Sequence, residues 1–327
     1  MAIAVSKIMK LKFLFPVILF CGAALFAQGA RPALLAREAR LEIRPESSTP
    51  ERLSQKGGAR LEERVTVETD DGWKLNARYL KAAQGVPTLI LIHTQKSDLT
   101  EWGLWFPYLK RYGYGYLALD LRGHGFSFVM PNGSTTSYKA FNTSGPDNEF
   151  NRMTRDVEAA VAYLSTNSVT ADKIILAGSV LGANLAIKTA AINQDIAMVI
   201  AISPALNVND VLSINPLRAY GKRPILLVVG TDRARQYKEF QLINDIAKSA
   251  CGKENVSVLV EAKGIGPDLV TKYNIKKVLD WLRNPRLPQI VELSSGTAQN
   301  PATQAGPQQE TDPDKEDSAA YKDEDDR

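Results

Sequence analysis

Residues 173–186, with the sequence KIILAGSVLGANLA, decide the fold of this chain. A short apolar run leads to Gly178, and small residues that favour a helix follow from Gly182. A buried strand that turns sharply into a helix has this pattern, because glycine accepts backbone conformations that strain other residues. We therefore predict a central parallel strand ending at Gly178, a turn with Val180 at its apex, and a helix over residues 181–191.

The same strand-and-helix pattern extends on both sides of this turn. Seven further segments have the length and apolar content of strands: 61–69, 73–80, 86–93, 115–120, 196–203, 224–230 and 255–261. Four segments between or after them have helical patterns: 102–111, 153–164, 236–250 and 269–283. Alternation at this spacing predicts an α/β fold, an eight-stranded and mostly parallel sheet with helices on both faces. The first two strands are expected to form an antiparallel edge.

The turn resembles the G-x-S-x-G nucleophile elbow of the α/β-hydrolases, and more closely the G-A-S-I-G-A-N form of hydrolases related to dienelactone hydrolase and the serine aminopeptidase-like branch. The segments LALDLRGHGFS (117–127), NRMTRDVEAAVAYL (151–164) and ISPALN (202–207) also resemble this family. The resemblance implies an α/β-hydrolase fold over residues 59–284. It also implies a catalytic triad in the chain order Ser, Asp or Glu, His.

All three triad positions carry residues that cannot perform the chemistry. The centre of the elbow is Val180, and the only serine nearby, Ser179, stands one residue early. The loop GTDRARQ (230–236) places Arg233 at the acid position, with Asp232 one residue before it. The loop AKGIGPD (262–268) places Ile265 where the family carries its histidine, and isoleucine cannot accept a proton. The resemblance therefore predicts the fold of a hydrolase without its nucleophile, acid and base.

The chain has two histidines, and both fit structural roles. His93 lies in LIHTQKSDLTEW, which resembles the family's segment around the oxyanion hole, and His124 lies in RGHG, which resembles the turn after the fourth strand. An oxyanion hole consists of backbone N–H groups, so it can survive the loss of the triad. Its expected donors are Leu181 and a residue at Thr94 or Gln95.

Three hypotheses about function follow. The first is an inactive pseudo-hydrolase whose old pocket holds a small acyl-type ligand or a protein partner. The second is an ester or acyl hydrolase with a non-standard catalytic set, Ser179 with His93 and Asp232. The third is an envelope interaction protein that works through its acidic tail. No cofactor, metal or nucleic-acid partner is expected, because the sequence shows no metal-ligand cluster and a net charge of only +4.

The N-terminal segment has the pattern of a signal peptide. Three lysines among the first twelve residues precede an apolar run over 13–27, and the small residues at Ala27 and Gly29 favour cleavage after residue 29. Cleavage would leave Cys251 as the only cysteine, hence no internal disulfide. We expect an exported protein, periplasmic or extracellular. The alternative is an uncleaved membrane anchor formed by residues 13–27.

Composition divides the chain into four parts: a signal peptide (1–29), a flexible linker (30–58), the α/β-hydrolase-fold domain (59–284) and a disordered acidic tail (285–327). The last eighteen residues carry nine acids and three bases, so the tail end has a charge of −6 and the remainder +10. Polar and acidic segments of this kind bury too little apolar surface to fold alone.

Overall fold

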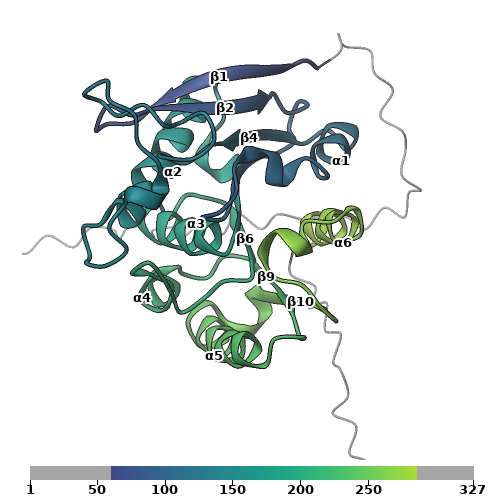
Figure 1. The fold of residues 1–327 in the computed structure, drawn as a ribbon. Coiled ribbons are helices and arrows are strands. Elements are labelled where there is room, and N and C mark those ends of the chain that lie inside the picture. Colours follow the sequence, from purple (N-terminus) through teal and green to yellow (C-terminus); the bar gives the residue numbers. More distant parts are fainter. Residues whose placement is uncertain (1–59, 286–327) are drawn as a thin grey trace, which may run out of the picture. The chain divides into compact units, whose positions relative to one another are not determined.

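The computed structural model describes residues 60–285. Eight strands form one sheet in the order β1-β2-β4-β3-β5-β6-β9-β10 (Figure 1). The strands are β1 Glu62–Glu68, β2 Lys74–Leu80, β3 Thr88–Ile92, β4 Gly115–Leu119, β5 Ile174–Ser179, β6 Met198–Ile202, β9 Ile225–Gly230 and β10 Val256–Glu261. β2 pairs antiparallel with β1 and with β4, whereas all other neighbours in this sheet are parallel. The predicted mostly parallel sheet with an antiparallel edge is confirmed.

Six α-helices accompany the sheet within residues 60–285. They are α1 Phe106–Arg111, α2 Glu149–Thr166, α3 Leu181–Ile192, α4 Ile214–Ala219, α5 Ala234–Cys251 and α6 Lys272–Arg283. The buried apolar residues of α2, α3 and α5 belong to one cluster, and those of α1 and α6 belong to a second. The sheet therefore separates two cores, with helices on both of its faces as predicted.

Alternation along β3 shows how one strand serves both cores. Leu89 and Leu91 pack in the cluster of α1 and α6, and Ile90 and Ile92 pack in the cluster of α2, α3 and α5. Successive side chains of a strand point to opposite faces, so a strand covered on both faces must be apolar throughout. This is why the central strands appear in the sequence as continuous apolar runs.

Two predicted helices begin later than expected. Residues 102–111 were expected to be one helix, but Trp102 ends a short 3-10 helix, η1 (Leu99–Trp102), and α1 begins only at Phe106. Gly103 and Pro107 explain the break, because glycine favours an interruption and proline is tolerated only in the first turn of a helix. The closing helix likewise begins later than predicted, at Lys272 rather than at residue 269. Leu269 is instead the last residue of another 3-10 helix, η5 (Gly266–Leu269).

The segment between β6 and β9 contains elements that were not predicted. Besides α4, it holds a two-stranded hairpin, β7 (Asn207–Val208) and β8 (Val211–Leu212). The two residues of its turn, Asn209 and Asp210, have φ angles of 51° and 63°. A turn with two positive φ angles favours Asn and Asp, so this pair was a signal in the sequence for the hairpin.

The hairpin braces the long connection between β4 and α2, which the sequence predicts as an excursion over the sheet edge. Asp210 accepts a hydrogen bond from the N–H of Gly145 at 2.7 Å, and the side chain of Asn148 donates to the carbonyl of Asn209 at 2.7 Å. Asn148 also caps α2 by accepting from the N–H of Asn151 at 2.8 Å. Such a cap stabilises a helix by about 1 kcal/mol, so one side chain both starts α2 and fixes the excursion.

Within residues 60–285, no helix is long and apolar enough to cross a bilayer. The predicted signal peptide, the whole predicted linker and nearly all of the acidic tail lie outside the described residues.

Candidate functional site

The turn after β5 has the backbone of an elbow. Val180 stands at its apex with φ 47° and ψ −101°, in the left-handed region that costs a β-branched residue most. The backbone before and after the apex is packed without space: a Cβ on Gly178 would lie 2.1 Å from the carbonyl oxygen of Gly182, and a Cβ on Gly182 would lie 2.1 Å from that of Ile92. The strand, apex and helix predicted from residues 173–186 are therefore present, with valine at the position that the resemblance assigns to the nucleophile.

The apex faces the loop that the resemblance assigns to the base. A Cβ on Gly266 would come within 2.7 Å of a methyl group of Val180. Val180 and Ile265 line the same cavity, which has a volume of about 340 Å³. The structure therefore brings together the nucleophile and base positions that the sequence indicated, but both side chains are apolar.

We call this cavity the elbow cavity. Its apolar lining consists of Val180, Pro204, Ala205, Val229, Phe240 and Ile265. Its polar lining consists of Ser203, Asn207, Arg235, Gln236 and Glu239, together with the backbone of Gly230 and Gly264. Ser203 has a φ of 50°, and its hydroxyl accepts a hydrogen bond from the N–H of Gly266 at 2.9 Å. A lining that combines apolar side chains with polar ones suits a small amphipathic molecule.

The acid position is less closely tied to this cavity. Arg233 is exposed and immediately precedes α5, whereas Arg235, two residues later, lines the cavity. Asp232 accepts a hydrogen bond from the N–H of Gly264 at 3.0 Å. Asp232 therefore holds the loop before Ile265 in place, which is a positioning contact.

A carboxylate that the sequence did not single out occupies the region of the expected oxyanion hole. Glu101, in η1, accepts a hydrogen bond from the hydroxyl of Ser179 with one oxygen and from the N–H of Thr94 at 3.0 Å with the other. Burial raises the pKa of Glu101, although these hydrogen bonds oppose the shift. One of the expected oxyanion donors therefore already has a partner inside the protein. Glu101 belongs to no triad position, so only its three-dimensional contacts reveal it.

His93 is part of the framework. It is fully buried, its Nε2 accepts from the N–H of Leu121 at 3.0 Å, and its Nδ1 lies 2.7 Å from the carbonyl oxygen of Thr94. Nδ1 therefore carries the proton. Burial lowers the pKa of His93 to about 3, and the neighbouring His124 ring adds to the shift. The ring stays neutral at ordinary pH and connects the ends of two strands.

His124 makes comparable contacts. Its ring nitrogens lie 2.9 Å from the carbonyl oxygen of Arg122 and 2.6 Å from that of Gln95, and the ring stacks on Tyr138 at 4.3 Å. The two carbonyl groups favour the protonated ring, but burial has the larger effect and lowers the pKa of His124. Gln95 thus takes part through its carbonyl group in fixing this turn.

The members of the non-standard catalytic set each bond elsewhere. Ser179 donates to Glu101, His93 bonds to the backbone of Leu121 and Thr94, and Asp232 bonds to Gly264. Ser179 is also fully buried. A nucleophile must reach its substrate and its base at once, and the neighbour of the Ser179 hydroxyl that could act as a base is Glu101.

The low pKa of His93 predicts a pH dependence of stability. In the unfolded chain this ring takes up a proton below about pH 6.5, whereas in the folded protein it does so only near pH 3, so stability is present above pH 6.5 and is lost as the pH falls. We expect His93 alone to lower the free energy of unfolding by about 1.4 kcal/mol per pH unit below 6.5. Urea unfolding of wild type and His93→Gln between pH 7 and pH 5 measures this, because the variant should lose that part of the slope. Equal slopes in the two proteins would contradict the prediction.

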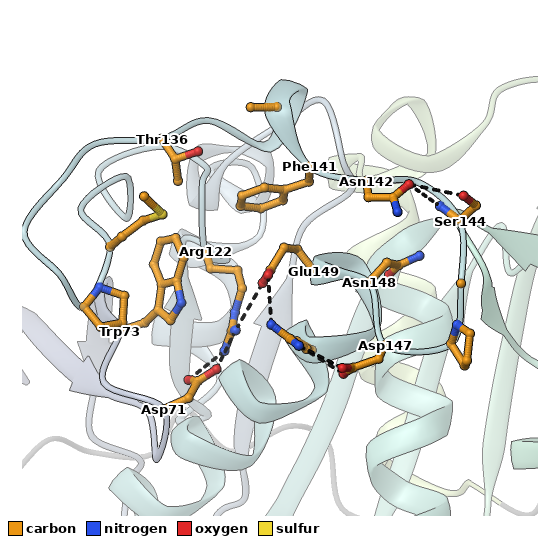
Figure 2. Close-up of a pocket in the computed structure, with 16 residues that line it drawn as sticks. Asp71, Trp73, Arg122, Thr136, Phe141, Asn142, Ser144, Asp147, Asn148 and Glu149 are labelled. Atoms are coloured by element: carbon orange, nitrogen blue, oxygen red, sulfur yellow. Dashed lines mark hydrogen bonds and ion pairs between the residues drawn. The ribbon is translucent and has the colours of Figure 1, made fainter.

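A second and larger cavity lies between the β1–β2 turn and the start of α2, with a volume of about 860 Å³. We call it the Arg122 cavity. Figure 2 shows Asp71 and Glu149 facing the guanidinium group of Arg122, with Trp73 and Phe141 beside them. The Arg122 side chain is fully buried and binds Asp156, also fully buried, at 2.7 Å. Both oxygens of Asp71 also bind it, at 2.7 and 3.0 Å.

The remaining candidate groups offer no further chemistry. Cys251 is buried, and burial raises the pKa of its thiol to about 11, so the reactive thiolate is disfavoured. Among the side chains of residues 60–285, no group of three or more His, Cys, Asp or Glu is placed to hold a metal ion.

The chain matches a family of known hydrolases over a region that includes the elbow. Residues 87–248 match the family model of serine aminopeptidase, S33. No curated protein matches the chain significantly.

Several solved structures share the fold. An esterase of Pyrococcus furiosus superposes with a TM-score of 0.54 at 19% identity, over 70% of this chain and 92% of the esterase. A dienelactone hydrolase of Anabaena variabilis gives 0.53 at 13% identity, over 70% of this chain and all of the other. A predicted CIB-like hydrolase of Thermoplasma acidophilum gives a TM-score of 0.52 at 18% identity, over 69% of this chain and 99% of the other. Identities this low concern the fold alone, and they confirm the α/β-hydrolase architecture predicted from the elbow.

Proposed function

Because the chain belongs to the α/β-hydrolase superfamily, we propose that it is an exported member without ester hydrolysis, which uses the elbow cavity to bind a small acyl-type ligand. The observation that carries the proposal is the pairing of Val180 with Ile265 across that cavity. These are the positions at which a working hydrolase needs a nucleophile and a base, and fold alone confers no activity.

The contacts of Glu101 support the same conclusion. Hydrolysis of an ester places negative charge on the carbonyl oxygen, and backbone N–H groups must be free to stabilise it. The Thr94 N–H donates to the Glu101 carboxylate instead. A second negative charge beside that carboxylate is unfavourable in a buried region.

The elbow cavity supports binding. Its volume of about 340 Å³ is near the lower end of the range for ligand sites, roughly 300–1,000 Å³. The apolar lining suits a short hydrocarbon chain, and Gln236 offers an amide donor to a carboxylate or ester oxygen. Arg235 pairs with Glu239 at 3.2 Å and offers its remaining N–H groups. A ligand with an acyl chain of moderate length and one polar end fits both parts.

Turnover and binding test the proposal together. We expect the purified protein to hydrolyse p-nitrophenyl acetate no faster than an unrelated protein of equal concentration, and to bind octanoate in a calorimetric titration. Ile265→Trp fills the cavity and should weaken octanoate binding by at least about ten-fold, or 1.4 kcal/mol. Ile192→Trp is the matched control, because Ile192 is 62% exposed and does not line the cavity. Equal affinities of the two variants would place the ligand elsewhere.

A hydrolase with a displaced serine is the second candidate, and the hydrogen bond from Ser179 to Glu101 favours it. A carboxylate that accepts the proton of a serine hydroxyl has the contact of a general base. This candidate predicts that a fluorophosphonate labels Ser179, and that Ser179→Ala and Glu101→Gln both abolish ester turnover. Turnover by the wild type that disappears in these variants would replace the proposal of an inactive member.

A further inference from the structure

We propose that the Arg122 cavity is a second binding site, independent of the elbow cavity, which takes an alkylguanidinium group. Such a group occurs in free agmatine-like amines and in the arginine side chain of a peptide. The proposal rests on the way the cavity already holds two guanidinium groups of its own and on the acceptor oxygens that remain beside them.

The two internal guanidinium groups show the chemistry of the cavity. Asp71 binds Arg122 with both carboxylate oxygens, and Asp147 binds Arg152 with both of its oxygens, at 3.0 and 2.8 Å. Parallel hydrogen bonds from a planar guanidinium to a carboxylate are strong and directional, and an ammonium group cannot form them in the same geometry. The cavity is thus built from carboxylates that accept forked donors.

Glu149 has acceptor capacity to spare. One of its oxygens accepts from Arg152 at 3.1 Å, but the other lies 3.7 Å from Arg122, at ion-pair distance and beyond a hydrogen bond. The side chain of Glu149 is 30% exposed and faces the cavity (Figure 2). The side chain of Asp147 is 81% exposed. A guanidinium group entering the cavity would find an acceptor on this Glu149 oxygen, and it would share Asp147, the oxygens of which already bind Arg152.

The charge of the lining favours a cation over an anion. The titratable lining residues are Asp71, Asp147 and Glu149 against Arg122 and Arg152. Two charged groups outside the lining also contact it: Asp156 binds Arg122 at 2.7 Å, and Arg155 lies 3.9 Å from Asp71. Burial raises the pKa of Asp71, but the hydrogen bonds from Arg122 and Thr69 and the charges of Arg122 and Arg155 together outweigh it, so that this pKa is lowered. The hydrogen bond from Arg152 lowers the pKa of Asp147, and both carboxylates are therefore charged near neutral pH. Both lining arginines already bind carboxylates, and an anion would have to displace them.

The wall of the cavity also suits a flat cation. The guanidinium carbon of Arg122 lies 5.4 Å from the ring centroid of Trp73, within the range of a cation–π contact. Phe141 packs edge-on against Trp73 at 6.4 Å, and Met130 and Pro131 complete the apolar side. The volume of about 860 Å³ leaves room for the alkyl part of the ligand or for the flanking residues of a peptide.

The test is a set of calorimetric titrations of the full chain with agmatine, the peptide acetyl-Gly-Arg-Gly-amide, putrescine and sodium sulfate. We expect agmatine to bind, putrescine to bind about ten-fold more weakly because it lacks the fork, and sulfate not to bind. Stronger binding of the peptide than of agmatine would identify a peptide as the source of the group, and the reverse would identify a free amine. Equal binding of agmatine and putrescine, or preference for sulfate, would overturn the proposal.

Three substitutions locate the site. Glu149→Gln keeps the shape and should weaken agmatine binding by at least about five-fold, whereas Arg152→Gln frees Asp147 and Glu149 from an internal competitor and should strengthen it. Asp172→Asn is the control, because this exposed acid precedes β5 at the amino end of the parallel strands, away from the cavity. Thermal melting of each variant checks folding. Weaker binding in Arg152→Gln would contradict the proposal even if Glu149→Gln were too unstable to measure.

Discussion

A variant with four substitutions, Val180→Ser, Arg233→Asp, Ile265→His and Glu101→Ala, is expected to hydrolyse p-nitrophenyl acetate, whereas the first three changes alone give little turnover. The three changes restore the nucleophile, acid and base at the positions that the family uses. Arg233 tolerates aspartate because it directly precedes α5, where aspartate caps a helix well. The close approach of Gly266 to Val180 places the new histidine next to the new serine.

The fourth change, Glu101→Ala, is the reason why the quadruple variant is expected to turn over faster than the triple variant. In the triple variant the Thr94 N–H still donates to Glu101, so the developing oxyanion would lack that donor and would meet a carboxylate. One oxyanion donor is worth about 100-fold to 1,000-fold in rate. We therefore expect the quadruple variant to exceed the triple variant by about 100-fold in kcat.

Steady-state kinetics of four proteins measure this effect: the wild type, the single variant Val180→Ser, the triple variant and the quadruple variant. Val180→Ser alone should gain little, because a hydroxyl without a base stays protonated and triad members act as a unit. Equal rates in the triple and quadruple variants would show that the Thr94 N–H is not part of the anion site.

Gly182→Ala is expected to destabilise the protein by more than about 3 kcal/mol, or to prevent folding. In an exposed helix the change from glycine to alanine stabilises the protein by about 1 kcal/mol. The expected change in the free energy of unfolding therefore has the opposite sign to the one that helix propensity predicts. The reason is the close packing of α3 against the end of β3: the new Cβ would lie 2.1 Å from the carbonyl oxygen of Ile92 and 2.8 Å from that of His93. Both obstacles are backbone atoms, which cannot move without displacing the central strand.

Gly133→Ala is the matched control for this experiment. Gly133 has a φ of 83° and nothing within 4 Å of an added Cβ, so only backbone strain of about 1–2 kcal/mol applies. Urea unfolding of the three proteins gives the comparison. A loss in Gly182→Ala no larger than that in Gly133→Ala would mean that the elbow relaxes easily and that its geometry is not fixed by packing.

The sequence predicted the architecture well because the strands bury both faces. A central strand such as β3 must be apolar throughout, and this requirement is visible in one dimension. The helix boundaries were less predictable: the pattern of residues 102–111 predicts one helix, yet Trp102 and Trp105 are both buried around a break at Gly103. The spacing of the buried tryptophans in the sequence is compatible with one continuous helix and also with a 3-10 helix followed by a separate α-helix.

The candidate site was predictable only for residues that lie shortly after the end of a strand of the sheet, because the fold determines where the ends of those strands lie. Val180 and Ile265 line the same cavity, because one follows a strand end and the other lies in the loop after β10. The role of Glu101 was not predictable, since its partner Ser179 is 78 residues away. The Arg122 cavity was missed for the same reason: its acids come from a hairpin turn and a helix start that the sequence does not connect.

The two apolar clusters on either side of the sheet have a consequence for the order in which the chain can fold. The cluster of α2, α3 and α5 draws its buried residues from Val67 to Val256, so a chain that emerges N-terminus first holds that side complete before α6 has emerged. The other side, with Trp102 and Trp105, needs Ile275, Val278 and Trp281 of α6. It stays open to solvent until α6, the last helix of the described residues, has emerged, and docking of α6 then covers this side of the sheet.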